Sequence, residues 1–221
     1  MGEFERIIFV SVIHTDIESV EEARRVVREM KPEVVAVELD HERYHQLINP
    51  PTETETSATS RGDMAHDLMQ QLALLEKSLG DITGSDVGDE MLAAIEEGRA
   101  IGAKIALVDR PMIATVQAMM KVSIDEIYKL TSMLPDATKD IENGGAGDLL
   151  AMLKEDGAVE DLMEQFRTEF PGLASVLIEQ RDQYVAKALH FILNDSKGLI
   201  VAVLGAGHIK GVRAALDNLM H

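Results

Sequence analysis

The sequence predicts an α/β protein with a mostly parallel central sheet flanked by helices. Four short apolar runs, rich in β-branched residues, are separated by helical segments; they are residues 6–13, 33–39, 104–108 and 199–204. Strands that are apolar on both faces are typical of a parallel sheet covered by helices on both sides. The first two runs enclose one helix, which predicts a β-α-β unit with parallel strands and a right-handed crossover.

Helical periodicity and capping signals place the first helices. Apolar residues recur at helical spacing across residues 19–30, and Lys31-Pro32 ends this helix. Thr15 or Asp16 can cap its N-terminus. The same period recurs in three further segments, which are residues 64–79, residues 87–101 and the stretch that begins at His208.

Residues 112–193 are expected to form a helical insertion that caps or layers the sheet, because no strand pattern interrupts them. Turn residues divide this insertion into helices at residues 112–121, 123–133, 147–154, 158–169 and 172–193, with Pro135 among the dividing residues. By contrast, residues 49–61 are rich in Pro, Thr, Ser and Glu, which predicts a flexible loop. A length of 221 residues indicates a single domain that spans residues 1–221.

Composition excludes several classes of function. The formal net charge of −18 argues against binding to nucleic acid or anionic membranes, since both require clustered Lys and Arg. The chain has no Cys, which rules out disulfides and thiol chemistry. No signal-peptide layout is present, and no apolar run approaches the roughly 20 residues needed to cross a bilayer. We therefore expect a cytoplasmic protein without a membrane span.

Polar side chains lie at or near the ends of all four expected strands. Three of the expected strands lead into His14, Arg110 and His208, and Glu38 lies near the end of the other. Because the carboxyl ends of parallel strands share one edge of a sheet, these residues can converge there. Two His and one Glu form a ligand set suited to Zn, Mn or non-haem Fe, which can activate a bound water. Arg110 could then bind a substrate carboxylate or stabilise oxyanion charge.

Two questions about these residues stay open at the level of sequence. His and Glu at strand ends are often simply solvated, and Arg110 could instead cap a helix or pair with an acid. Glu38 could be a metal ligand or, alternatively, the general base that accepts a proton from metal-bound water. The spacing of the residues does not separate these roles.

Five short motifs lie in order along almost the whole chain. They are Ser11-Val-Ile-His14, Val37-Glu38-Leu39-Asp40-His-Glu-Arg43-Tyr44, Val108-Asp109-Arg110-Pro111, Glu179-Gln-Arg181-Asp182 and Gly205-Ala-Gly-His208 with Gly211. In this combination the chain resembles the TraB/PrgY family, also called pheromone-shutdown proteins, and more distantly the Tiki/GumN metalloprotease-like group. Ser11 departs from the family's usual Gly-x-x-His, and the membrane-spanning tail of many microbial relatives is not found before His221.

The resemblance implies an α/β core with one pocket that contains the His, Glu and Arg residues of the motifs. It implies His14, Glu38 and His208 as ligands of a divalent metal (Zn, Mn or Co), with Glu38, Arg110 and Arg181 as catalytic residues. Arg43, together with Arg110 and Arg181, is implied to bind substrate. A soluble part of a membrane-anchored protein is the alternative to a purely cytoplasmic one.

Three functions are therefore considered. The leading hypothesis is a metal-dependent, peptidase-like hydrolase. The second is a regulatory protein that binds a peptide or small anionic ligand through its arginines without turnover. The third is a structural or partner-binding protein, in which the helical insertion packs against a second copy as a homodimer.

Overall fold

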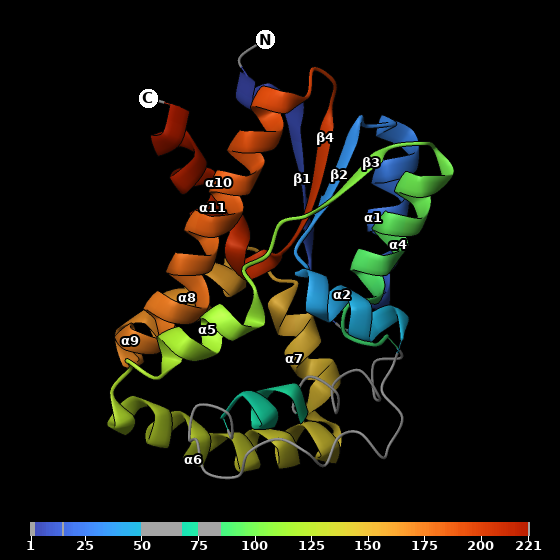
Figure 1. Ribbon diagram of the computed structural model, residues 1–221. Helices are drawn as coiled ribbons and strands as arrows, with labels where there is room; N and C mark the ends of the chain where they lie inside the picture. Colours follow the sequence, from blue (N-terminus) through green and yellow to red (C-terminus); the bar gives the residue numbers. More distant parts are fainter. Residues whose placement is uncertain (1–2, 15, 50–67, 75–84, 221) are drawn as a thin grey trace.

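A parallel four-stranded sheet forms the centre of the computed structural model, which describes residues 3–14, 16–49, 68–74 and 85–220 (Figure 1). The strand order is β1-β4-β2-β3, and every neighbouring pair is parallel. The strands are β1 (Ile7–Val12), β2 (Val34–Val37), β3 (Lys104–Leu107) and β4 (Ile200–Gly205). The predicted fold class, a parallel α/β sheet flanked by helices, is confirmed.

The last strand of the chain occupies the middle of the sheet. β4 is buried along its whole length and pairs with both β1 and β2, so the first two strands of the chain are not neighbours. In the register of the sheet, Val203 lies beside both Val10 and Val37, and Gly205 lies beside Val12. The segments that follow β1, β2 and β4 therefore leave the sheet at the same edge.

Helices cover both faces of the sheet (Figure 1). On one face, α1 (Ile17–Met30) and α4 (Asp89–Ala100) pack on an apolar cluster that includes Val35, Val37 and Val203. On the other face, α10 (Gln180–Asp195) and α11 (Ala206–Met220) pack on a cluster that includes Ala36, Ala202 and Leu204. Alternate residues of each strand thus serve the two cores, as expected for a sheet with two buried faces.

The ends of α1 follow the capping signals in the sequence. Asp16 is the N-cap and its side chain accepts a hydrogen bond from the Glu18 backbone N–H. The helix ends at Met30, and the C-cap residue Lys31 adopts the left-handed conformation with φ 44°. Of the two candidate caps, Thr15 and Asp16, Asp16 is the one observed, and the helix begins at Ile17, slightly before the expected periodic segment.

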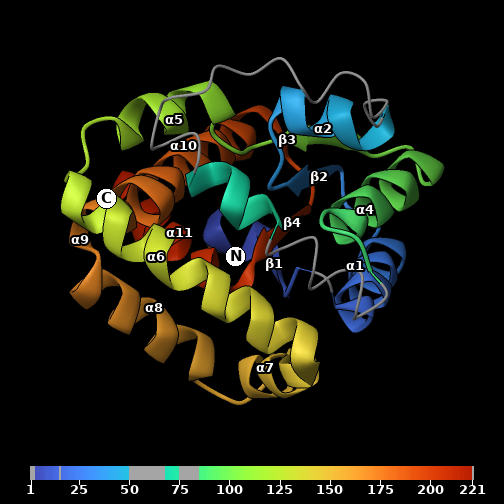
Figure 2. The ribbon, with the colours of Figure 1, turned by 90° about the horizontal axis from the view of Figure 1, so that it is seen from below.

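A further layer of helices lies across the carboxyl edge of the sheet (Figures 1 and 2). Its members are α2 (His41–Ile48), α5 (Met112–Met119), α6 (Ile124–Asp140), α7 (Ala146–Leu153), α8 (Ala158–Glu169) and α9 (Pro171–Ala174), with residues 68–74 also helical. Short helical turns of other types also occur in the described residues. A 3₁₀ turn forms η1 (Glu3–Arg6), and π-helical turns form η2 (Ile141–Gly145) and η3 (Ser175–Glu179). Of the segment expected to be helical at residues 112–193, the helices from α5 to α9 lie in this layer, whereas α10 packs on a face of the sheet.

Pro135 does not end a helix as predicted. It lies inside α6, which continues to Asp140, so the expected end near residue 133 is wrong. Ile127 and Leu134 of this helix are buried in a third apolar cluster with Leu173. We attribute the continuity of α6 to this packing, which offsets the cost of about 3 kcal/mol for a proline inside a helix.

Two expectations fall on parts of the chain that the structure does not describe. The predicted flexible loop at residues 49–61 lies outside the described residues, apart from Asn49 at the end of α2. Of the helix expected at residues 64–79, only residues 68–74 are described, and these are helical. Within the described ranges, no helix combines the length and apolar character needed to cross a membrane.

Candidate functional site

His14, Glu38 and His208 converge around Gly205, at the end of the central strand. The Gly205 backbone N–H donates a hydrogen bond of 2.8 Å to Glu38 Oε2. A Cβ atom placed on Gly205 would lie 3.2 Å from His14 Nε2, 3.5 Å from Glu38 Oε2 and 3.7 Å from His208 Cδ2. Three side chains that are distant in sequence therefore face one small space, which the missing side chain of Gly205 leaves open.

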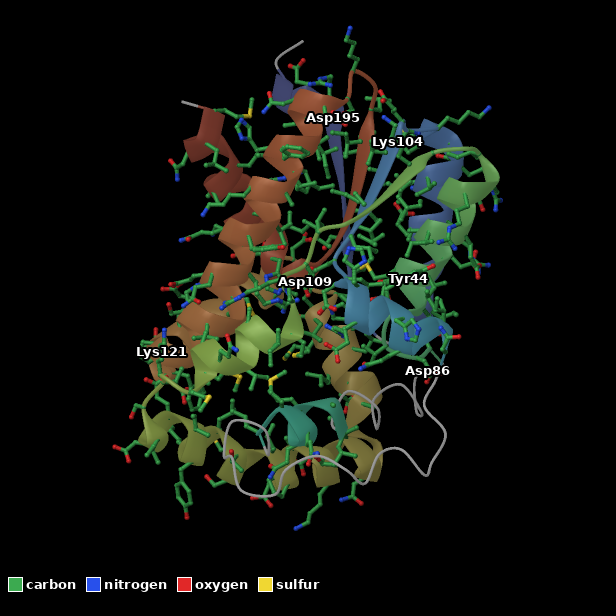
Figure 3. The ribbon with its side chains drawn as sticks, viewed as in Figure 1. Tyr44, Asp86, Lys104, Asp109, Lys121 and Asp195 are labelled. Carbon is green, nitrogen blue, oxygen red and sulfur yellow. The ribbon has the colours of Figure 1, made fainter. Side chains whose placement is uncertain are left out.

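Arg181 joins this group from α10. Its Nη2 atom donates to Glu38 Oε1 at 2.7 Å and to Asp109 Oδ2 at 2.7 Å, and its Nε atom donates to Asp109 Oδ1 at 3.1 Å. Its Nη1 atom lies 3.4 Å from His208 Nε2. Asp109, labelled in Figure 3, lies where the lower end of the sheet meets the helical layer. We call His14, Glu38, Arg181 and His208 the central cluster.

Each histidine of the central cluster is held by a buried carboxylate on its other ring nitrogen. His14 Nδ1 lies 2.6 Å from Glu90 Oε1, and His208 Nδ1 lies 2.7 Å from Asp182 Oδ1. A carboxylate at Nδ1 favours the tautomer with the proton on that nitrogen, which leaves Nε2 as a lone-pair donor. The Nε2 atoms of both rings therefore face the space beside Gly205 and Glu38.

The sequence does not point to Glu90, and it offers Asp182 only as a member of the motif Glu179-Gln-Arg181-Asp182. Glu90 lies on α4 next to the buried Met91 and one turn before the buried Ala94, and its side chain is 1% exposed. One of its oxygens, Oε2, has no hydrogen-bond partner in the described part of the chain. A charged residue on the apolar face of a helix is the signal that could have found it.

Charge in the central cluster favours an ionised Glu38. Burial disfavours the charged carboxylate, but His208, Arg181, His14 and the Gly205 N–H together outweigh it and lower the pKa of Glu38 to about 2. Burial raises the pKa of Asp182, and its hydrogen bond to His208 opposes that shift only partly. A carboxylate with so low a pKa is ionised at neutral pH, which is compatible with Glu38 as a metal ligand or as an anchor for Arg181.

Arg110 lies apart from the central cluster. Its Nη1 donates to Gln180 Oε1 at 2.9 Å and its Nη2 donates to the Ala114 carbonyl at 2.7 Å. It lines, with Arg43 and Arg181, a pocket of about 540 Å³ beside the cluster. We call this cavity the arginine pocket. The sequence-predicted residues thus divide between the central cluster and the arginine pocket, and Arg181 belongs to both.

Asp40 explains why Arg43 and Arg110 reach the same pocket. Its Oδ1 accepts hydrogen bonds from the N–H groups of Glu42 and Arg43 and so caps α2. Its Oδ2 accepts the N–H of Met112, the first residue of α5. One buried carboxylate therefore joins the starts of two helices. Arg43 lies in the first turn of α2, and Arg110 lies two residues before the start of α5.

The donor chemistry of the central cluster suits the divalent metal that the resemblance implies. Two imidazole Nε2 atoms and one ionised carboxylate face the space beside Gly205, and buried carboxylates orient both rings. As the side chains stand, however, the described ranges contain no group of three or more His, Asp or Glu that could hold a metal ion. In this arrangement Arg181 lies against both Glu38 and His208.

The fold and the central cluster define a class of parallel α/β protein with a buried His/Glu/Arg centre at the carboxyl edge of the sheet. The sequence model of the TraB/PrgY/gumN family matches residues 3–220. The chain therefore belongs to this family, and the resemblance drawn from the five motifs is confirmed.

Known relatives cover this chain almost completely but are longer than it is. The "Uncharacterized protein MJ1365" of Methanocaldococcus jannaschii is 30% identical over 226 residues, which cover 96% of this chain and 54% of that protein. The "TraB domain-containing protein" of Bos taurus is 26% identical and that of Homo sapiens 25%, each over 94% of this chain and 61% of the relative. The chain thus spans a little over half the length of these relatives.

Proposed function

We propose that this chain is a metal-dependent hydrolase of the peptidase-like kind, with its reactive centre at the central cluster. The observation that carries the proposal is the pair of buried carboxylates, Glu90 and Asp182, at Nδ1 of His14 and His208. This arrangement recurs around metal-binding histidines in proteins, where it fixes the ring and raises its basicity. A histidine that served only as a solvated strand end would need no such support.

Each residue of the cluster has a role that follows from its contacts. His14 Nε2, His208 Nε2 and the Glu38 carboxylate would hold the metal, which when bound supplies an activated water at neutral pH. Glu38 stays ionised because of its low pKa and keeps both Arg181 and the Gly205 N–H in place. Arg181, fixed by Asp109, presents a guanidinium that can stabilise negative charge developing on a substrate oxygen.

Metal analysis of the untagged protein tests this proposal. Protein purified without chelators is titrated with Zn, Mn and Co by calorimetry and assayed by mass spectrometry for bound metal. We expect one divalent metal per chain in the wild type and none in His208→Ala. His45→Ala, which removes an exposed histidine of α2, is the matched control and should bind as the wild type does. A folded wild type that binds none of the three metals would overturn the proposal.

A second candidate function is capture of a peptide or anion without turnover. It is favoured by the arginine pocket, where the guanidinium groups of Arg43 and Arg110 line one cavity in a strongly acidic chain. The two functions differ in one measurement. A mixture of short peptides incubated with metal-loaded protein is cleaved if the chain is a hydrolase and is recovered intact if the chain only binds.

A further inference from the structure

We propose that the arginine pocket binds the C-terminal end of a peptide whose last residue is apolar. Arg43 and Arg110 would bind the terminal carboxylate, and the apolar wall of the pocket would take the side chain. The inference rests on the proposed function, since it names the substrate class of the same site. It adds that the substrate enters by its carboxyl end.

The first argument is charge. Outside the pocket, Arg25 and Arg28 lie in ion pairs with carboxylates, whereas Arg6 donates to the backbone carbonyls of Leu193 and Ser196. The Arg110 guanidinium donates instead to two neutral oxygens, those of Gln180 and the Ala114 carbonyl. The Arg43 side chain makes no hydrogen bond or ion pair within the described ranges. Among the described residues, the guanidinium groups of Arg43 and Arg110 are thus left without a carboxylate partner, although Asp and Glu outnumber Lys and Arg 39 to 21 in the sequence.

The second argument is the lining of the rest of the pocket. Most of its other side chains are apolar, and they come from residues 68–74, from α5 and from η3; they are Met69, Leu72, Ala73, Met112, Val116 and Leu177. The pocket volume of about 540 Å³ lies in the range of small-molecule sites, roughly 300–1,000 Å³. Two cations beside an apolar wall suit a ligand that carries an anionic group next to an apolar one. A free inorganic anion would leave the wall exposed to water.

The third argument selects a carboxylate over a phosphate. Asp109 also lines the pocket, so its carboxylate places negative charge in the same cavity as Arg43 and Arg110. Arg181 balances this charge, because its guanidinium donates hydrogen bonds to both oxygens of the Asp109 carboxylate. A singly charged carboxylate can accept hydrogen bonds from both guanidinium groups through its two oxygens. The second negative charge of a phosphate would be repelled by the Asp109 carboxylate.

Arg181 links the pocket to the proposed chemistry. It lines the arginine pocket and also contacts Glu38 and His208 of the central cluster. A peptide held by its terminal carboxylate would therefore direct its last peptide bonds towards the cluster. Hydrolysis of such a bond adds one water, breaks the C–N bond and gives a new carboxylate on the shortened peptide and an amino group on the released residue. The expected products are amino acids removed from the carboxyl end.

The test measures binding separately from turnover. In the presence of EDTA, calorimetry compares acetyl-Ala-Leu with a free carboxylate, its C-terminal amide, acetyl-Ala-Gly and inorganic phosphate. We expect the acid to bind and each of the other three to bind at least roughly tenfold more weakly, since a charge-assisted bidentate pair or a buried Leu side chain is lost. Equal binding of the acid and the amide, tighter binding of phosphate, or no binding of the acid would each overturn the proposal.

Variants place the ligand in the pocket. Arg43→Gln should weaken binding of acetyl-Ala-Leu roughly tenfold while leaving the fold intact, because the Arg43 side chain makes no hydrogen bond or ion pair with the residues that the structure describes. Arg25→Gln changes an arginine of α1, a helix that does not line the pocket, and this matched control should bind as the wild type does. Unchanged affinity in a folded Arg43→Gln protein would contradict the proposal. Binding without any cleavage by the metal-loaded protein would support the pocket and overturn the hydrolase alone.

Discussion

Gly211 and Asp182 lie in direct contact, because the Asp182 carboxylate occupies the space that a Cβ atom on residue 211 would need. Asp182 comes from α10 and Gly211 from α11, so the contact fixes the approach of these two helices. Asp182 in turn holds His208, one turn earlier on α11, through the 2.7 Å contact with Nδ1. A residue without a side chain is therefore required for the orientation of a histidine in the central cluster.

Gly211→Ala is expected to destabilise the protein and to disturb His208. The added methyl group must displace the Asp182 carboxylate or separate α10 from α11, which costs about 1–3 kcal/mol as other overpacked sites do. Urea unfolding measures this loss. Gly147→Ala in α7 is the control, because no atom lies within 4 Å of its Cβ position, and it should be neutral or slightly stabilising. Equal midpoints for both variants would show that the contact at Gly211 yields without cost.

Arg181→Met should be among the most damaging single changes in the described part of the chain. Glu38 and Asp109 are each 3% exposed in their side chains and would lose the guanidinium that pairs with both. Removal of one partner from a buried ion pair costs about 3–5 kcal/mol, because a charge is left buried without compensation. Thermal and urea unfolding measure the effect. Arg25→Met, which breaks only exposed pairs with Glu22 and Glu29, should leave the midpoint nearly unchanged.

The sequence predicts the sheet and three members of the central cluster for one physical reason. Continuous apolar runs can be satisfied only by strands buried on both faces, and parallel strands must place their carboxyl ends at one edge. His14, Glu38 and His208 follow directly from that rule. The same rule applied to Arg110 gives a residue at the correct edge but not its contacts, since those depend on where Gln180 and Ala114 lie.

What the sequence does not predict comes from the packing of separate helices. Glu90 reaches His14 because α4 packs on α1, and no local pattern relates residues that are 76 positions apart. The position of β4 between β1 and β2 likewise depends on tertiary pairing rather than on strand propensity. Arg181 was connected to the site by its motif alone, and its contacts with Glu38 and Asp109 give the physical reason for an arginine at the start of α10.

Glu90 is expected to act as a positioning residue for His14. Glu90→Gln keeps an oxygen that can accept the Nδ1 proton, whereas Glu90→Leu removes it. Metal affinity should therefore fall by roughly 10–100-fold in Glu90→Leu and by less in Glu90→Gln. The ¹⁵N shifts of the His14 ring should report loss of the Nδ1-protonated tautomer in Glu90→Leu alone, a change that simple destabilisation would not produce. If both variants keep the tautomer and the affinity of the wild type, Glu90 has no positioning role.

Glu38→Gln should remove a part of the stability that depends on pH in a defined window. The pKa of Glu38 falls from an ordinary value of 4.5 to about 2 in the folded protein, because His208, Arg181 and His14 outweigh the effect of burial. A lowered pKa means that the folded state binds fewer protons than the unfolded state, so this contribution is full above pH 4.5 and is lost as the pH falls towards 2. A shift of this size corresponds to about 3 kcal/mol.

Urea unfolding of the wild type and of Glu38→Gln, measured from pH 6 to pH 2, should show a difference in free energy that shrinks only within this window. Glu155→Gln changes an exposed residue of the helical layer and should show no such trend. A difference that stays constant across the window, or that disappears already between pH 7 and 5, would show that Glu38 is not held ionised by the central cluster.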